Sequence, residues 1–436
     1  MRLIVIGAGL AGLAAADAAR HAGAEVIVLE ARNRIGGRTW TVPFGPGFID
    51  LGAAWLHGPL DNPLTEALTA AGIESRNDGG FGSGTAIWDG QWVEAADATT
   101  VTSVIWVEFD PEDALAAHPD RDDLGEGVEW FLDDRELSGR ARALTRRGLL
   151  RILGGCLAAG QPDRVSLQGL ADYVEGGGGN LLPAGGYGAL VERLADGLKI
   201  RLESAATRVE HGPAGLSVQT GVGNFEADAA IVTAPLGVLK AGALSFDPPL
   251  SDSQAEAIQR LEMGTLEKIA FRFDRPFWPE SVRRINCLGE GSAFPQWVNL
   301  SRNTGAPTLV AFYNPSYFPR VAATPAAERA ELALDQLREM YDEVPDPVET
   351  RVTDWASDRW ARGSYSYVPI GASTADMGLL AEPVSERLAL AGEATVPQSY
   401  GTAHAAFGSG LRAAAQVLGK RPEQLSLGPI GAHWPS

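Results

Sequence analysis

Three glycines near the start of the chain have a spacing that suits the binding of a dinucleotide. Gly7, Gly9 and Gly12 follow the short apolar run that opens the chain. Glycines at this spacing allow a tight turn and let the backbone approach a pyrophosphate, which the N-terminus of the following helix attracts. Glu30 ends a second apolar run over residues 24–29, where an acid can hold ribose hydroxyls. This order predicts a nucleotide-binding strand, helix and strand, with a glycine-rich turn that binds no ligand as the alternative.

Arg34 and Arg38 follow Glu30 within eight residues. These two arginines flank Gly36 and Gly37, which brings positive charge and close backbone approach to the same point. We therefore expect a second contact with the pyrophosphate there.

The composition is that of a folded protein with more than one core. The chain has 436 residues, of which 45% are apolar and 21% charged, so two domains are expected. No stretch approaches the roughly 20 apolar residues that span a bilayer, and the opening strand leaves no room for a cleavable signal segment. We expect no membrane association and a cytoplasmic location.

The net charge and the positions of the histidines and cysteines argue against several classes of function. A formal net charge of −19 argues against nucleic acid as a partner, because phosphates would be repelled, and slightly favours a cationic ligand. The six histidines lack metal-ligand spacing, so no metal is expected. Cys156 and Cys287 fit neither a disulfide framework nor a metal site and are interpreted as buried apolar residues.

Segments that resemble parts of a nucleotide-binding domain recur along the chain, and two segments without that pattern separate them. Residues 124–157 are predicted to be helical, and the glycine run 176–179 that follows is interpreted as a surface turn, a joint or a close backbone approach. A helix over 187–198 and strands near 200–202, 207–210, 216–220 and 229–235 are also predicted. The expected fold class is α/β, a Rossmann-like nucleotide-binding domain interleaved with an α+β substrate domain that has a mixed sheet flanked by helices. The expected boundaries are 1–77, 180–242 and 386–436 for the first domain, and 78–179 and 243–385 for the second.

A later helix and strand carry a lysine of interest. Ser251 has the spacing of a capping box, and the helix is predicted to continue over 255–263 and to stop at Gly264. In the strand that follows, over residues 265–273, a period of two separates the aromatic face from the face that carries Lys268. On this pattern alone, Lys268 would face solvent.

Further motifs extend along almost the whole chain. They are D-L-G-A-A-W-L-H-G over residues 50–58, L-P-A-G-G-Y over 182–187, V-T-A-P-L over 232–236, W-A-R-G-S-Y-S over 360–366, G-E-A-T over 392–395 and G-L-R-A-A over 410–414. With R-I-G-G-R over 34–38, this set resembles the flavin-dependent amine oxidases, the family of monoamine oxidases, polyamine oxidases and lysine-specific histone demethylases, and most of all the polyamine oxidases. The resemblance implies that the nucleotide is FAD.

The resemblance also implies which residues contact FAD. Backbone near Val209 would touch the adenine, Glu393 would reach the ribityl chain, and the helix that begins near Gly401 would direct its positive end at the flavin. Ser364 stands where the monoamine oxidases carry a cysteine bonded to the flavin; since serine forms no thioether, FAD is expected to be bound non-covalently. The full implied set is Gly7, Gly9, Ala11, Gly12, Glu30, Ala31, Arg32, Gly36, Gly37, Arg38, Gly52, Ala53, Ala54, Trp55, Val209, Ala234, Trp355, Gly392, Glu393, Gly401, Thr402 and Ala403.

The catalytic residues are likewise implied by the family. Lys268 matches the lysine whose ammonium holds a water near flavin N5. Tyr365 and Tyr400 fall where the family places two aromatic rings in front of the flavin, which would attract and orient an amine. Trp55 and His57 would line the substrate channel, with His57 near a distal amine; a packing histidine is an equal alternative.

The implied activity is oxidative deamination of a small-molecule amine. Hydride would pass from the α-carbon to flavin N5, the imine would be hydrolysed, and O2 would reoxidise the flavin with release of H2O2. The W-L-H-G segment, Ser364 and the acidic charge favour a polyamine such as spermine or spermidine, free or acetylated. A primary monoamine or an amino acid is the alternative, with Arg272, Arg283, Arg320 and Arg362 as candidates for binding a carboxylate. More distant alternatives are a desaturase or porphyrinogen oxidase of the wider flavoprotein superfamily, and a non-catalytic flavoprotein.

Overall fold

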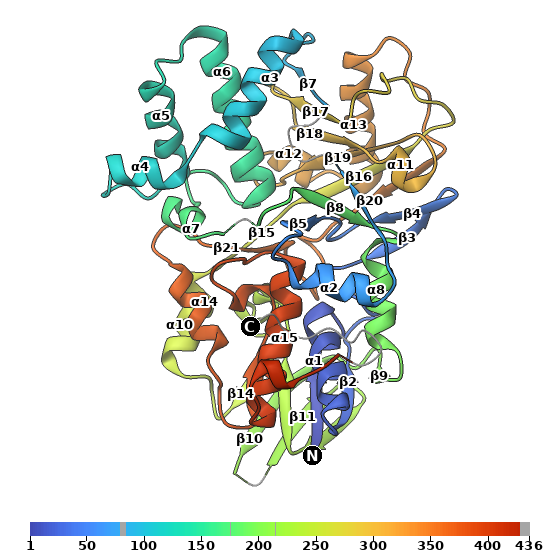
Figure 1. The fold of residues 1–436 in the computed structure, drawn as a ribbon, viewed down its shortest axis with the longest axis vertical. Helices are drawn as coiled ribbons and strands as arrows, with labels where there is room; N and C mark the ends of the chain where they lie inside the picture. The colour runs from blue at the N-terminus through green and yellow to red at the C-terminus, as the bar shows by residue number, and fades with distance from the viewer. Residues whose placement is uncertain (79–83, 175, 214, 428–436) are drawn as a thin grey trace.

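The elements of the chain form two groups along its long axis, called here the lower half and the upper half (Figure 1). The computed structural model describes residues 1–78, 84–174, 176–213 and 215–427. Each half is built around its own sheet, and segments far apart in the sequence contribute to both.

The lower half contains a five-stranded sheet in the order β22-β13-β1-β2-β9, in which all neighbouring strands are parallel. Its strands are β1 (Arg2–Ile6), β2 (Glu25–Leu29), β9 (Lys199–Arg201), β13 (Ala229–Val232) and β22 (Leu388–Leu390). The central strands are continuous apolar runs because both faces of the sheet are covered. The strands come from all three segments that the sequence assigns to the nucleotide-binding domain, and the α/β fold class is confirmed.

Helices cover one face of this sheet, and a second sheet covers the other. Helices α1 (Leu10–His21), α8 (Gly186–Ala195) and α15 (Ala403–Leu418) share an apolar core with Leu3 and Val5. Ile4 and Ile6 point the other way and share a core with the sheet β12-β11-β10-β14. The strands of that sheet are β10 (Ala206–Gly212), β11 (Gly215–Thr220), β12 (Gly223–Ala227) and β14 (Ser245–Asp247). Since β14 pairs with β10, the lower half extends past residue 242; the domain boundaries otherwise remain a prediction.

The upper half contains a six-stranded mixed sheet in the order β20-β16-β19-β18-β17-β7. Its strands are β7 (Thr85–Trp88), β16 (Glu267–Arg272), β17 (Arg284–Cys287), β18 (Gln296–Asn299), β19 (Thr308–Tyr313) and β20 (Glu349–Val352). Helix α13 (Ala326–Met340) covers the face that carries Ile269 and Phe271. The opposite face, with Ala270, packs on residues of the N-terminal segment such as Phe44 and Leu51.

A group of helices that includes the predicted helical stretch 124–157 lies beside this sheet and is called here the helical block (Figure 1). Its members are α3 (Ala95–Ser103), η1 (Val104–Glu108), α4 (Pro111–Ala117), α5 (Leu124–Asp134), α6 (Gly139–Gly148), η2 (Leu149–Leu157) and α7 (Leu167–Ala171), of which η1 and η2 are π-helical. The glycine run that follows is a close backbone approach: the amide of Gly58 donates to Gly179 O over 3.0 Å, and a Cβ on Gly58 would collide with Gly176.

Further short elements lie in both halves. They are β3 (Thr41–Phe44), β4 (Gly47–Asp50), β5 (Leu56–His57), α2 (Pro63–Ala70), β6 (Ser75–Asn77), β8 (Asn180–Pro183), α9 (Leu236–Lys240), α10 (Asp252–Arg260), β15 (Glu262–Gly264), α11 (Ser301–Thr304), α12 (Pro319–Ala322), β21 (Tyr365–Tyr367), α14 (Thr374–Ala381), η3 (Glu393–Thr395) and η4 (Pro422–Gln424). The helix predicted over 255–263 therefore ends early. Ser251 caps it as expected, but β15 pairs with β21, so Gly264 lies in a strand and does not end a helix.

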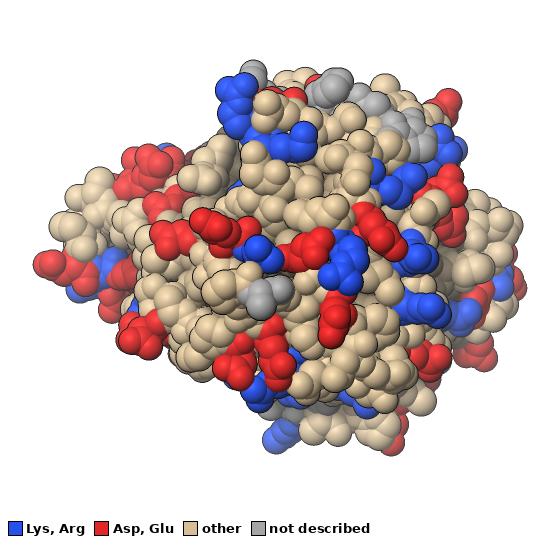
Figure 2. All heavy atoms as spheres, turned by 90° about the horizontal axis from the view of Figure 1, so that it is seen from below, with Lys and Arg blue, Asp and Glu red and all other residues tan. Residues whose placement is uncertain are grey.

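Two features bear on contact with a membrane or with nucleic acid. Among the described residues, no helix combines the length and apolar character needed to cross a membrane. On the face shown in Figure 2, acidic and basic side chains are interspersed and form no continuous basic patch.

Candidate active site

A cavity of about 520 Å³ is lined by residues of both halves. Small-molecule sites have volumes of about 300–1,000 Å³, so this cavity suits a ligand of that kind. The predicted residues Lys268, Tyr365, Tyr400, Trp55 and His57 all line it, and so does every predicted cofactor residue except Gly12 and Val209.

Gly12 and Val209 lie beside the cavity and do not line it. A Cβ on Gly12 would collide with the carbonyl oxygen of Gly7, so this glycine lets α1 pack against the end of β1. Val209 is fully buried in β10. Ala205 and Ala206, just before it, line the cavity in its place.

The end of the parallel sheet forms a polar cradle of the type that binds a nucleotide. Glu30 is 5% exposed, and its carboxylate accepts hydrogen bonds from the amides of Ala8 (2.7 Å) and Arg32 (2.8 Å). Gly9, at the N-terminus of α1, has no side-chain cap and lines the cavity. The amides of the first helical turn lack partners within the helix and attract phosphate. These residues fit the adenosine and pyrophosphate of FAD.

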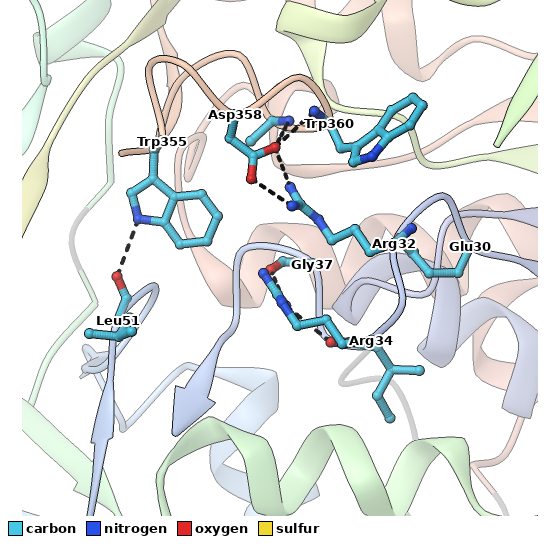
Figure 3. A network of polar contacts seen from close by, with 10 residues as sticks. Glu30, Arg32, Arg34, Gly37, Leu51, Trp355, Asp358 and Trp360 are labelled. Atoms are coloured by element: carbon cyan, nitrogen blue, oxygen red, sulfur yellow. Dashed lines mark hydrogen bonds and ion pairs between the residues drawn. The ribbon is translucent and has the colours of Figure 1, made fainter. Parts of the chain in front are cut away.

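The arginines around this cradle have separate partners (Figure 3). Arg32 lines the cavity and donates two hydrogen bonds to the carboxylate of Asp358, at 2.6 and 2.8 Å. Arg34 turns away: it donates to Gly37 O at 2.9 Å, and its guanidinium carbon lies 4.3 Å from the Trp40 ring centroid. Of the two arginines expected to give a second pyrophosphate contact, Arg38 lines the cavity and Arg34 does not.

Glu393 is fully engaged with donors from three parts of the chain. Its carboxylate accepts from Arg38 Nη1 (2.7 Å), from Ser366 Oγ (2.5 Å) and from the amide of Gly401 (3.0 Å). Gly401, Thr402 and Ala403 line the cavity at the N-terminus of α15. The positive end of this helix thus faces the cavity, where it would stabilise negative charge on a flavin ring.

Lys268 does not face solvent, contrary to the expectation from strand alternation alone. It is 7% exposed, because the N-terminal segment covers its face of β16. Its Nζ donates to Asp50 O (2.9 Å) and Gly52 O (2.5 Å) and lies 5.5 Å from the Trp55 ring centroid. Burial lowers the pKa of Lys268 to about 8 and raises the pKa of the nearby Asp50 carboxyl to about 6. A lysine in this state can hold a proton or a water at neutral pH.

Tyr365 and Tyr400 are anchored by their hydroxyls to backbone carbonyls. Tyr365 Oη donates to Cys156 O at 2.5 Å, and Tyr400 Oη donates to Gly169 O at 2.8 Å. Burial raises the pKa of both phenols, so both are neutral at physiological pH. The Tyr173 ring packs edge-on against Tyr400, at 5.5 Å between centroids.

His57 and Trp55 lie on the cavity wall with their polar atoms bonded within the protein. His57 Nδ1 donates to Asn180 Oδ1 over 2.6 Å, and burial lowers the pKa of the imidazole. The imidazole of His57 is therefore neutral at pH 7. Trp55 Nε1 donates to Asp78 Oδ2 over 2.8 Å.

Several lining residues were not predicted from the sequence. Arg284 is 2% exposed, pairs with Asp78, and lines the cavity, whereas Arg272, Arg283, Arg320 and Arg362 do not. An arginine and an asparagine in a short buried strand, Arg284–Cys287, were the available signal. Further unpredicted lining residues include Ile105, Trp106, Phe109, Leu153, Leu170 and Tyr173 from the helical block.

The two cysteines differ in burial. Cys287 is fully buried, but Cys156 is only half-buried and lines the cavity. Ser364 Oγ donates to Leu266 O and accepts from its amide, both over 2.8 Å. Among the described residues, no group of three or more His, Cys, Asp and Glu side chains could hold a metal.

The fold and the cavity are those of a nucleotide-binding oxidoreductase, and comparison with known sequences agrees with this class. Residues 10–418 match the family model of flavin containing amine oxidoreductases. The chain belongs to this family, and its cofactor is FAD.

The curated relatives include two kinds of protein. Polyamine oxidase 3 of Oryza sativa is 33% identical over 94% of this chain and 88% of its own length. Lysine-specific histone demethylase 1 homolog 2 of Oryza sativa is 34% identical over 95% of this chain, which spans only 57% of that protein.

Solved structures agree on the fold. Putrescine oxidase bound to putrescine superposes with a TM-score of 0.77 at 22% identity, over 96% of this chain and 100% of the other.

Proposed function

We propose that the protein catalyses the oxidative deamination of a small-molecule amine, with O2 as electron acceptor and H2O2 as product. FAD, when bound, would supply the chemistry by accepting hydride from the carbon next to the nitrogen. The observation that carries this proposal is that Lys268, Tyr365 and Tyr400 line the same cavity as the residues that fit FAD.

Each of these side chains has a role that its contacts support. Because the tyrosine hydroxyls are bonded to Cys156 O and Gly169 O, the rings are held in place and their faces remain to attract and orient the amine. Lys268 Nζ, with a lowered pKa, would hold a water or pass a proton during reoxidation.

A polyamine such as spermine or spermidine, free or acetylated, is the first candidate substrate. The 33% identity to a plant polyamine oxidase over 88% of its length supports this candidate. The net charge of −19 would also favour the approach of a cation. His57, neutral and on the cavity wall, would contact the distal part of the chain. The cytoplasmic location remains a prediction.

A primary monoamine or an amino acid is the second candidate, and one observation favours it. Glu30 and Glu393 are the acidic side chains that line the cavity among the described residues, and both are already bonded within the protein. A second ammonium of a polyamine would therefore lack a carboxylate partner, and burial of an unpaired charge is costly. Arg284, which also lines the cavity, is likewise already paired, with Asp78, so the lining favours a monoamine over both a polyamine and an amino acid.

A panel of amines would test the proposal and rank the candidates. Peroxide release would be measured with spermine, spermidine, N-acetylated polyamines, simple primary monoamines and L-amino acids. The polyamine proposal expects the highest kcat/KM with spermine, spermidine or their acetylated forms. Preference for monoamines or amino acids would support the second candidate, and no peroxide with any amine would contradict both.

A further inference from the structure

A loop between β20 and β21 forms part of the cavity wall and contacts both halves of the molecule. It carries Trp355 and Trp360, which both line the cavity. The loop folds back on itself, since the amide of Gly363 donates to Trp355 O at 2.9 Å. Figure 3 shows it above the segment that contains Arg32 and Leu51. We call residues 353–364 the bridging loop.

The base of the bridging loop is fixed to the upper half. The Glu267 carboxylate, fully buried in β16, accepts from Thr353 Oγ1 (2.5 Å) and from the amide of Ala356 (3.0 Å). The amide of Lys268, the next residue of β16, donates to Thr353 Oγ1 (2.8 Å), and the amide of Thr353 donates to Lys268 O (3.0 Å). The base is therefore held by the same strand that positions Lys268.

The tip of the bridging loop is fixed to the lower half by a charged pair. Both guanidinium nitrogens of Arg32 donate to the Asp358 carboxylate, and the two side chains are 12% and 24% exposed. One Asp358 oxygen also accepts from the amides of Trp360 (2.8 Å) and Ala361 (3.0 Å). The same carboxylate therefore shapes the tip and ties it to the end of β2.

We propose that Asp358 is a positioning residue that retains the cofactor: it locks the bridging loop onto Arg32, and FAD leaves only when this ion pair opens. Arg32 lies on the cavity wall next to the nucleotide cradle, and Trp360 lies on the wall beside it. A two-pronged, partly buried arginine–carboxylate pair is stronger and more directional than an exposed one. Because Ser364 forms no covalent bond to FAD, such contacts must supply the retention.

Removal of the charge alone tests the proposal. Asp358→Asn keeps an oxygen that can accept from the amides of Trp360 and Ala361 but loses the ion pair, whereas Asp358→Ala loses both. Asp228→Asn is the matched control, since it breaks the exposed Arg2–Asp228 pair (57% and 44% exposed). FAD release from the holoenzymes would be followed by flavin fluorescence after dilution, at several salt concentrations.

The expected result is release about tenfold faster from Asp358→Asn, the change that corresponds to the loss of roughly 1.4 kcal/mol. Salt should speed release from the wild type and from Asp228→Asn, and much less from Asp358→Asn, because salt screens an existing ion pair. Two results would overturn the proposal. In the first, Asp358→Asn releases FAD at the wild-type rate while Asp358→Ala releases it fast, which would mean that only the contacts with the amides of Trp360 and Ala361 matter. In the second, the release rates of all four proteins depend equally on salt.

Discussion

Lys268 holds its ammonium between two backbone carbonyl oxygens and two aromatic rings. Its Nζ donates to Asp50 O and Gly52 O and lies 5.4 Å from the Phe312 ring centroid. Burial makes the charged form costly, while the carbonyls and rings favour it. The balance leaves a group that can exchange a proton near neutral pH.

Replacement of Lys268 by Met should impair the oxygen reaction more than the reaction with the amine. If Lys268 Nζ assists reoxidation, Lys268→Met should slow the reoxidation of the reduced enzyme on the order of 100-fold, with a smaller effect on anaerobic reduction. Stopped-flow absorbance would measure both rates. Lys199→Met, at a lysine whose side chain is 71% exposed, is the control and should match the wild type; equal slowing of both half-reactions would contradict the assigned role.

Lys268 should also affect how stability depends on pH. Its pKa is lowered to about 8 in the folded protein from an ordinary value of 10.5. Between these values the unfolded chain binds the proton and the folded protein does not, so the contribution of Lys268 to the free energy of unfolding rises with pH. Relative to Lys268→Met, the wild type should therefore gain stability as the pH rises from about 8 to 10.5, by at most about 1 kcal/mol per pH unit, and no more above 10.5. Urea unfolding at several pH values would measure this difference, and a flat difference would show that the pKa is not lowered.

At the scale of elements, the two tyrosine rings depend on three segments far apart in sequence. Tyr400 precedes α15 and bonds to Gly169 O of α7, while Tyr365 of β21 bonds to Cys156 O of η2. The helical block thus holds both rings from above. Its π-helices η1 and η2 also supply Trp106 and Leu153 to the cavity wall.

Variants of Tyr400 separate the ring from its anchor. Tyr400→Phe keeps the ring and loses only the bond to Gly169 O, so a reduction of kcat/KM within about fivefold is expected, in line with a net hydrogen-bond contribution near 1 kcal/mol. Tyr400→Ala loses the ring and should reduce kcat/KM by a further tenfold or so. Steady-state peroxide assays with the best amine would measure both. Equal losses in the two variants would mean that the hydroxyl, and not the ring face, is what matters.

Local patterns predicted elements well and failed where distant pairing decides the structure. The alternation in β16 was correct, but the exposure of Lys268 was not, because residues 40–55 cover that face. The helix after Ser251 was predicted too long because β15 pairs with β21, about a hundred residues later. Arg284 was missed because its partner, Asp78, is 206 positions away.

In the whole molecule, the cavity lies where the two halves meet. Each half has an apolar core of its own, and a third cluster of buried residues runs from Ile4 and Ile6 of the lower half to the helical block of the upper half. The nucleotide cradle belongs to the lower half, Lys268 to the upper half, and the bridging loop to both. The cradle could be predicted because its glycines and Glu30 are close in sequence. The apolar wall of the substrate side could not, since it depends on how the helical block packs over the sheet.

Removal of FAD should therefore destabilise the protein as a whole. A ligand held by both halves stabilises the folded state by about 2.7 kcal/mol at a free concentration 100 times its Kd. Apoprotein prepared without FAD should melt several degrees lower than holoenzyme, and added FAD should restore the melting temperature while FMN, which lacks the adenosine, should restore it less. Scanning calorimetry would measure this, and equal restoration by FMN would contradict the assigned role of the cradle around Glu30.

Whether the protein is a flavin-dependent amine oxidase is tested most directly by mixing the purified protein anaerobically with amines while the oxidised-flavin absorption band is recorded. A purified amine oxidase should show this band, lose it on mixing with a good amine substrate, and regain it with release of H2O2 when air is admitted. If no polyamine, monoamine or amino acid bleaches the band, the protein is not an oxidase of these amines, and a flavoprotein of another activity is favoured.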